Sequence, residues 1–221
     1  MLKNVLLALV LAGSSSVALA QRLVDYEITI TNITPGQTFT PQLVVTHPEE
    51  IRIFEAGLPA SESLEILAEG GDTEPLSNDL FNEAYDVATI GALLPPGETT
   101  SIVVAGQPGL GYISIAAMMI PTNDTFMALN RVKLPRRGSM SFTVPAYDAG
   151  TEYNDQNCAN IPGPRCGGVG YSAEPGEGYV HIGNGFHDLG QTGEGGSEIL
   201  APQMYDWRNS VATITVRRMN N

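Results

Sequence analysis

The sequence is short of cysteine, histidine and basic residues, and each shortage excludes a class of function. Its 221 residues include two cysteines and three histidines, and no further cysteine or suitably spaced histidine supports a zinc site built on the cysteine pair. Eleven basic residues stand against 24 acidic ones, which gives a formal charge of −13 at pH 7. Nucleic acid is therefore excluded as a partner, because its phosphates require a basic protein face.

Motifs of catalysis are also scarce. The chain has no G-x-S-x-G nucleophile elbow, the turn that exposes the serine of an α/β-hydrolase. It has no glycine-rich phosphate loop either. The carboxylate pairs Asp72/Glu74 and Glu174/Glu177 lie in glycine-rich segments, where we interpret them as solvated charges. The sequence therefore does not indicate an enzyme.

No segment after the first twenty residues resembles a membrane span, which needs about 20 apolar residues. The first twenty residues have the pattern of a secretory signal peptide. Lys3 is followed by apolar Val5–Ala12, and Ala18-Leu19-Ala20 offers small residues to a signal peptidase. We expect a signal peptide at residues 1–20, one mature domain at 21–221, and a secreted or periplasmic location. An uncleaved anchor is the alternative.

The two cysteines, Cys158 and Cys166, are eight residues apart. In an oxidising compartment, a disulfide between them is the expected state. By the loop-entropy estimate, such a bridge stabilises the fold by about 2–3 kcal/mol. We expect it to hold a local loop rather than the whole domain. A metal-thiolate pair is the alternative, but no further cysteine supports it.

Strand-like runs dominate the chain. Each is bounded by Gly, Pro, Asn or Asp, which end strands and form turns. The predicted strands are Tyr26–Thr31, Thr38–Val45, Ile51–Phe54, Thr100–Ala105, Tyr112–Ile120, Ser139–Val144, Tyr179–Ile182 and Val211–Val216. The 24 glycines and 15 prolines agree with a turn-rich β protein.

Two segments break this strand pattern. Ser61–Ala68 begins with an N-cap serine before an apolar stretch, and apolar residues recur at helical spacing in Asn78–Ala92. About eight strands with one or two short helices predict an all-β fold, an antiparallel β-sandwich. A closed barrel is the alternative. The segment Asp148–Glu177 has few apolar residues and is expected to form a long loop.

Two short acidic loops each follow a predicted strand. The first, PTNDTF, follows Tyr112–Ile120 and carries Asp124. The second, PAYDAGTE, follows Ser139–Val144 and carries Asp148 and Glu152. If the two strands are neighbours, the three carboxylates meet at one end of a sheet, where they repel one another unless a cation lies among them. This pattern predicts one bound calcium ion.

The ligand chemistry agrees with calcium. This ion takes six to eight oxygen ligands at about 2.3–2.6 Å from carboxylates, carbonyls and water. Besides the three carboxylates, Asn123, Thr151 and Asp155 offer oxygen donors in or near the loops. The alternative is that Asp124 and Asp148 only form turns, a common use of aspartate after a strand.

The two motifs resemble those of the spondin N-terminal domain, the module of F-spondin and mindin. There the motifs read close to PSPDWF and DAGTD, against PTNDTF and DAGTE in this chain. The C-terminal segments GYVHIGNGFHDLG and YDWRNSVATITVRR are similar to the bacterial secreted form of the domain. The resemblance extends from Tyr26 to Arg218, nearly the whole expected mature chain.

This resemblance implies a β-sandwich with one calcium ion held by acids of the two loops. Asp124 matches the acid of the first motif, and Asp148 and Glu152 match the leading and trailing acids of the second. The chain departs from the family at Thr125, which replaces an aromatic residue, and at Glu152, which replaces an aspartate. The longer Glu152 side chain must lie farther back or bind through both oxygens.

The animal relatives imply a role in adhesion, so we expect a secreted, calcium-binding module for an unidentified protein or glycan on a cell surface or matrix. The sequence does not indicate an oligomeric state. One alternative is a metal-dependent hydrolase that uses His181 and His187, which flank a Gly-Asn-Gly turn; convergence of the two imidazoles would favour it. Another is a purely structural envelope protein whose calcium serves only stability.

Overall fold

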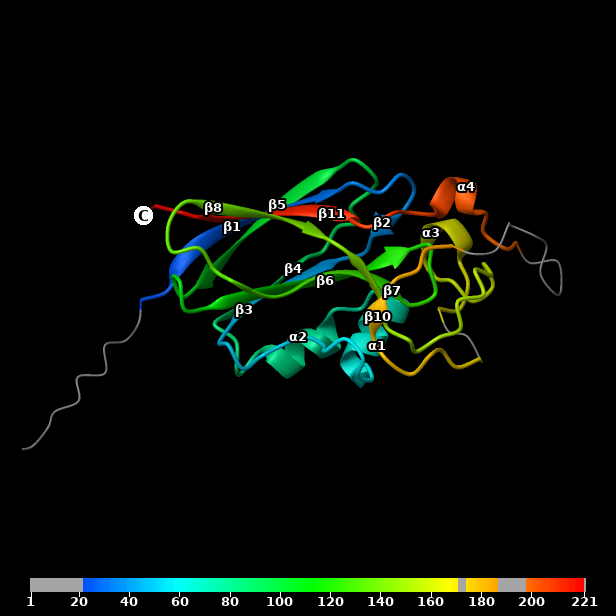
Figure 1. Cartoon of the computed structure of the whole chain (residues 1–221), viewed down its shortest axis with the longest axis horizontal. Helices are drawn as coiled ribbons and strands as arrows, with labels where there is room; N and C mark the ends of the chain where they lie inside the picture. Colours follow the sequence, from blue (N-terminus) through cyan, green and yellow to red (C-terminus); the bar gives the residue numbers. More distant parts are fainter. Residues whose placement is uncertain (1–21, 171–173, 187–197, 221) are drawn as a thin grey trace, which may run out of the picture.

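The predicted antiparallel β-sandwich is confirmed by the computed structural model, which describes residues 22–170, 174–186 and 198–220. The signal peptide predicted at residues 1–20 lies outside these residues. The described chain forms eleven strands and four short helices, and the strands make two antiparallel sheets (Figure 1). Within the described ranges the sheets stay open, so the alternative of a closed barrel is wrong.

The elements differ in length, from two-residue strands to strands and a helix of nine residues. The strands are β1 (Val24–Asn32), β2 (Thr38–Phe39), β3 (Gln42–His47), β4 (Asp86–Ile90), β5 (Thr99–Gly106), β6 (Tyr112–Ile120), β7 (Thr125–Lys133), β8 (Ser139–Val144), β9 (Ala146–Asp148), β10 (His181–Ile182) and β11 (Ala212–Arg218). The helices are α1 (Glu62–Gly70), α2 (Glu74–Leu80), α3 (Gly163–Cys166) and α4 (Pro202–Tyr205). None of these helices is long and apolar enough to cross a bilayer.

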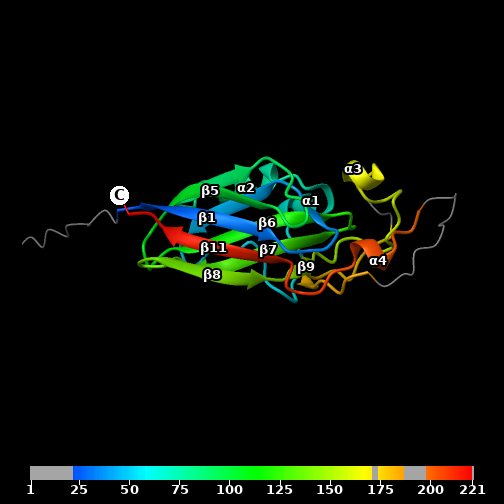
Figure 2. The ribbon, with the colours of Figure 1, turned by 90° about the horizontal axis from the view of Figure 1, so that it is seen from above.

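The smaller sheet has the order β5-β1-β11-β8 and is buried on one face only (Figure 2). Successive side chains of a strand point to opposite faces. In β1, Tyr26, Ile28 and Ile30 are fully buried against the second sheet, whereas the residues between them are partly exposed. On the outer face, Arg217 of β11 forms an ion pair with Glu27 at 2.6 Å. The alternation of β1 and β11 in the sequence is therefore the signature of this half-exposed sheet.

The larger sheet has the order β10-β9-β7-β6-β3-β4, with β2 paired to β6, and it is covered on both faces. On β3, Val44 packs into the core between the sheets, whereas Leu43 and Val45 pack against helices α1 and α2. Figure 1 shows these helices on the face of the sheet opposite the smaller sheet. Burial on two faces explains why β6 reads as an unbroken apolar run instead of alternating.

Helix α1 confirms the predicted helix at Ser61–Ala68. The Ser61 hydroxyl oxygen accepts a hydrogen bond from the amide of Leu64 at 3.2 Å, which is the N-cap interaction expected of serine. The helix ends where the amide of Gly71, in a left-handed conformation with φ of 71°, donates to the carbonyl of Leu67 at 2.9 Å. Leu64 and Leu67 are fully buried against the larger sheet, so the cap and the packed face support the same helix.

Three predicted elements differ in the structure. Ile51–Phe54 has no regular structure; Ile53 and Phe54 are buried beside α1, and the amide of Ile53 donates to a side chain, Asn130. The helix predicted over Asn78–Ala92 is wrong, because β4 pairs with the open edge of β3 and its β-branched residues suit a strand. The single strand predicted at Thr38–Val45 is broken into β2 and β3 at Pro41, which cannot donate to a ladder.

His47 is the last residue of β3 and is fully buried. Its Nδ1 donates to the carbonyl of Pro48 at 2.7 Å, so its Nε2 accepts from the hydroxyl of Ser114 at 2.8 Å. Burial lowers the pKa of His47, partly offset by the Pro48 hydrogen bond, and the charge of Arg131 lowers it further. The imidazole of His47 is therefore harder to protonate in the folded protein than in the unfolded chain.

Substitution His47→Gln is expected to make stability less dependent on pH. The unfolded chain takes up the His47 proton near pH 6.5, whereas the folded state resists it, so this histidine costs stability as pH falls below that value. We expect the variant to be about 1–3 kcal/mol less stable at pH 8, with a smaller deficit at pH 5. Urea unfolding at both pH values measures this, and a constant deficit would contradict the assignment.

Candidate metal centre

The two acidic loops meet because the chain changes sheets between them. Strand β8 belongs to the smaller sheet and pairs with β11, while β9, one residue later, joins the larger sheet and pairs with β7. The register of this pairing sets Thr125 opposite Asp148. The strands at 112–120 and 139–144 lie in different sheets, so the condition that they are neighbours is not met. The loops converge through β7, which was absent from the predicted strands, and through β9.

Asp124 lies immediately before β7 and is fully buried. Its carbonyl accepts from the amide of Ala149 at 3.2 Å. Its Oδ2 accepts from the amide of Thr151 at 2.8 Å, the hydroxyl of Thr151 at 3.2 Å and the amide of Glu152 at 3.1 Å. Its Oδ1 is also buried, but has no hydrogen-bond partner among the described residues. One oxygen of Asp124 therefore organises the second acidic loop, and the other receives no hydrogen bond from the described residues.

Asp148, the last residue of β9, is 3% exposed, and its charge acts on Asp124. Burial, followed by the negative charge of Asp148, raises the pKa of Asp124 to about 7, although the hydrogen bonds from Glu152 and Thr151 oppose the shift. Burial also raises the pKa of Asp148, against hydrogen bonds from Asn154 and Gly150. Both carboxylates are thus costly to ionise without a compensating cation.

Glu152, the third predicted ligand, is 1% exposed. Its backbone amide donates to Asp124, and its backbone forms an isolated antiparallel bridge with Pro175. The structure thus places the three predicted acids in buried positions on two loops that contact one another.

Gly150 explains the tightness of the second acidic loop. It has a left-handed conformation with φ of 69°, which glycine adopts without strain. Its amide donates to Asp148 Oδ1 at 2.9 Å, and its carbonyl accepts from the amide of Gly178 at 2.8 Å. A Cβ atom at this position would collide with the backbone of Tyr179. The loop and the segment at 176–180 therefore pack backbone to backbone.

A second group of ligand-type side chains includes Asp148. Strand β10 pairs with β9 so that His181 lies opposite Asp148, and Glu177 lies one loop earlier. Ligand atoms of Asp148, Glu177 and His181 all lie within 4.8 Å of one another, so this group could hold a metal ion. Asp124 and Glu152 are not members of it. Glu177 was expected to be a solvated charge. The four-residue spacing between Glu177 and His181 is the one feature of the sequence that could have suggested a shared site.

The imidazole of His181 is held in place by its neighbours. Burial disfavours its charged form, but the carbonyl of Ile182 and the carboxylates of Asp148 and Glu177 together raise the pKa of His181. The convergence of His181 with His187, on which the hydrolase alternative depends, is not tested, because His187 lies outside the described residues.

A cavity of about 110 Å³ opens beside these side chains. Asp148, Glu177, Tyr153, Asn154 and Trp207 are among the residues that line it. The volume suffices for several water molecules. Solvent or a small ligand group can therefore reach Asp148 from this side.

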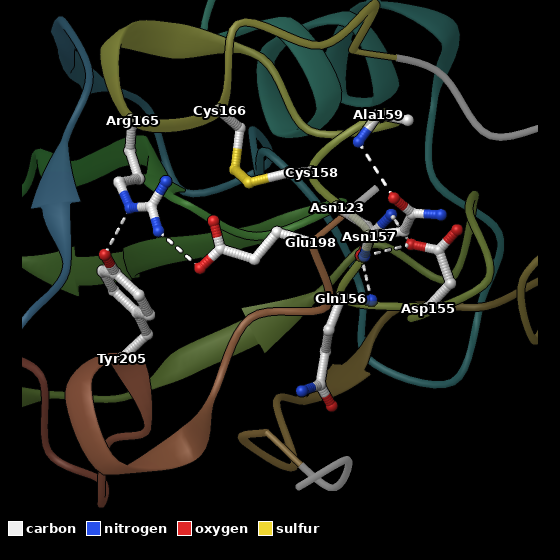
Figure 3. Close-up of a disulfide and its surroundings, with 10 residues drawn as sticks. All are labelled: Asn123, Asp155, Gln156, Asn157, Cys158, Ala159, Arg165, Cys166, Glu198 and Tyr205. Atoms are coloured by element: carbon white, nitrogen blue, oxygen red, sulfur yellow. Dashed lines mark hydrogen bonds and ion pairs between the residues drawn. A yellow bond between two sulfur atoms is a disulfide. The ribbon is translucent and has the colours of Figure 1, made fainter. Parts of the chain in front are cut away.

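The predicted disulfide between Cys158 and Cys166 is present and closes a local loop (Figure 3). This loop is joined to the first acidic loop through Asn123. The side-chain amide of Asn123 donates to Asp155 at 3.0 Å, and its oxygen accepts from the amide of Gln156 at 3.3 Å. The bridge therefore stabilises the segment that supports the residue next to Asp124.

Substitution Gly150→Ala is expected to destabilise the fold more than Gly138→Ala. Both glycines have positive φ, which costs other residues about 1–2 kcal/mol. Only at Gly150 would the added methyl group also meet backbone atoms, because nothing lies within 4 Å at Gly138. Urea unfolding of the two variants measures the difference. Equal decreases in the free energy of unfolding would show that the loop at Gly150 accommodates the methyl group, which would contradict the prediction.

Comparison with known proteins agrees with this architecture. The profile of the spondin N-terminal domain family (Spondin_N) matches residues 30–161. The matched segment contains Asp124, Asp148 and Glu152 and ends before Glu177 and His181. A comparison with curated proteins gave no match.

The family is one of non-catalytic domains, and the all-β fold suits it. Together with the disulfide, the match indicates an extracellular type of module. Because the profile covers more than half of the 221 residues and the fold is the expected sandwich, this chain belongs to the spondin N-terminal domain family.

Proposed function

We propose that this protein is a secreted calcium-binding module in which one calcium ion orders the loops at one end of the sandwich. The observation that carries the proposal is the carboxylate of Asp124. It is fully buried beside the charge of Asp148, and its Oδ1 has no hydrogen-bond partner among the described residues. A buried carboxylate oxygen with no donor requires a cation or a proton.

The donor set suits calcium. Asp124, Asp148 and Glu152 offer only oxygen, the ligand that this hard ion prefers. All three residues are at most 3% exposed, and in such a region of low dielectric a cation would interact strongly with their carboxylates. Calcium also tolerates irregular geometry and two-oxygen binding, which accommodates the longer side chain of Glu152.

The ion would act on the loops through contacts that already exist. Asp124 Oδ2 holds the backbone of Thr151 and Glu152, and that loop in turn holds residues 174–178 through the carbonyls of Gly150 and Thr151. A cation on Oδ1 would fix the Asp124 carboxylate, and with it both loops. The end of the sandwich that carries the two acidic loops and residues 174–178 (the loop end) would then present one defined surface.

The same end presents apolar side chains to solvent, which supports a role in adhesion. Tyr153 is 54% exposed and Tyr179 is 44% exposed, in the loops beside the acids. Val169 follows α3, and Met204 lies in α4; they are 75% and 64% exposed. Aromatic residues and methionine are enriched in protein interfaces. The proposed partner is an unidentified protein or glycan of a cell surface or matrix.

The melting temperature of the purified protein is expected to be higher with calcium than with a chelator. A ligand at 100 times its Kd stabilises the folded state by about 2.7 kcal/mol, a shift of several degrees for a domain of this size. Asp124→Asn should abolish the shift. In the presence of chelator, the variant should be at least as stable as the wild type. Its side-chain oxygen can still accept the hydrogen bonds from Thr151 and Glu152, and the buried negative charge is removed.

Asp79→Asn is the matched control, since Asp79 is exposed at the end of α2, away from the acidic loops. This variant should keep the full calcium shift. A wild-type melting temperature that ignores calcium, or an Asp124→Asn variant that still responds, would contradict the proposal.

Calcium-dependent adhesion separates an interaction module from a purely structural protein. We expect labelled protein to bind at least one member of a panel of immobilised glycans and matrix proteins in calcium, and to lose that binding in chelator. Tyr153→Ser should weaken binding while it keeps the calcium shift in melting temperature. Calcium stabilisation without calcium-dependent binding to any surface would favour the structural role.

A further inference from the structure

We propose a second cation position, formed by Asp148, Glu177 and His181, that binds a divalent transition metal of the zinc class. It lies on the β10 side of Asp148, whereas the proposed calcium position involves Asp124 and Glu152. The two positions share Asp148 and differ in every other ligand. The proposal goes beyond the calcium site, because its key ligand is a nitrogen.

Strand pairing creates this position. In the antiparallel pair of β9 and β10, His181 stands directly opposite Asp148, so their side chains lie on the same face of the sheet. Glu177 is brought to them by the loop at 176–180, which is fixed by hydrogen bonds from Gly178 to Gly150 and from Val180 to Leu58 at 2.8 and 2.9 Å. The three ligands thus come from backbone that is held on both sides.

The hydrogen bonds of His181 identify which nitrogen faces the carboxylates. Nδ1 lies 2.9 Å from the carbonyl of Ile182, and since a carbonyl only accepts, Nδ1 carries the proton. Nε2 is buried and has no hydrogen-bond partner among the described residues. In a neutral imidazole the lone pair of Nε2 therefore points toward two carboxylates. Metal-binding histidines commonly donate their other nitrogen to a backbone carbonyl in this way.

The distances fit metal ligands better than hydrogen bonds. His181 Nε2 lies 3.5 Å from Asp148 Oδ1 and 3.6 Å from Glu177 Oε2, beyond the usual range of about 2.7–3.2 Å for a hydrogen bond to nitrogen. Zinc bonds nitrogen and carboxylate oxygen at about 2.0–2.2 Å, so two ligands of a tetrahedral ion are about 3.4 Å apart. The three ligand atoms lie within 4.8 Å of one another, so a rotation of the partly exposed Glu177 side chain would bring them around one ion.

The surroundings support the ligands. Asp148 Oδ1 accepts from the amide of Gly150 and Oδ2 from the side chain of Asn154 at 2.8 Å, which fixes the carboxylate plane. The ring of Tyr179 lies 5.5 Å from that of His181. Glu177 is 43% exposed and borders the cavity with Asp148, so solvent can supply a fourth ligand.

The mixture of ligand types selects the metal. Calcium and magnesium prefer oxygen throughout, whereas imidazole favours zinc and its neighbours in the transition series. An ion that requires His181 is therefore chemically distinct from the ion that requires Asp124. This difference makes the two positions separable by mutation.

Zinc affinity of the purified protein, measured at pH 8 by competition with a chromophoric chelator, tests the proposal. We expect His181→Gln and Glu177→Gln each to weaken zinc binding at least tenfold. Glu174→Gln is the matched control: it removes the same charge from an exposed position three residues earlier, and zinc affinity should stay unchanged. His181→Gln should keep the calcium shift in melting temperature, so that failure of either site is seen independently.

A second measurement uses the wild-type protein and does not depend on how a variant folds. Zinc should shift the ¹⁵N resonance of His181 Nε2 in an imidazole NMR spectrum, and calcium should not. The proposal is overturned if zinc leaves that resonance unchanged or if His181→Gln binds zinc as tightly as the wild type. It is also overturned if Asp124→Asn abolishes zinc binding that His181→Gln retains, since zinc would then occupy the calcium position.

Discussion

The pairing of β9 with β7 is the interaction on which the loop end of this protein depends. It sets Asp148 opposite Thr125 and brings its charge to bear on the buried Asp124. Burial and the negative charge of Asp148 raise the pKa of Asp124 to about 7, so the ionised form of this carboxylate is disfavoured in the folded protein. A cation bound at this position, as we propose, would offset that cost and fix the two acidic loops.

The rest of the architecture supplies a rigid frame for that end. The larger sheet lies between the smaller sheet and helices α1 and α2, so its strands are buried on both faces. The acidic loops emerge from strands that cannot easily shift, and the disulfide loop supports them through Asn123. Both ends of the described chain lie at the opposite end of the sandwich (Figure 1). The acidic loops therefore lie far from both ends of the described chain.

Much of this fold follows from the sequence, because local patterns determine it. The alternation of β1 and β11, the N-cap Ser61 and the cysteine spacing each predict their element without knowledge of the rest. The sheet change at Pro145 arises because β8 pairs with β11 and β9 pairs with β7, which lie in different sheets. These pairings join segments distant in sequence, so no local pattern predicts the change. The acids at 124, 148 and 152 could be identified by motif. The partnership of His181 with Asp148 could not, since a two-residue strand does not indicate which neighbour it pairs with.

A crystal of the protein grown in calcium, with anomalous diffraction recorded at long wavelength, tests the central claim most directly. The account predicts an anomalous peak about 2.3–2.6 Å from Asp124 Oδ1, the bonding distance of calcium to oxygen. Oxygens of Asp148 and Glu152 should lie around the same peak. A well-ordered map with no peak there, and with Asp124 Oδ1 bonded to a protein donor or a water molecule instead, would contradict the account.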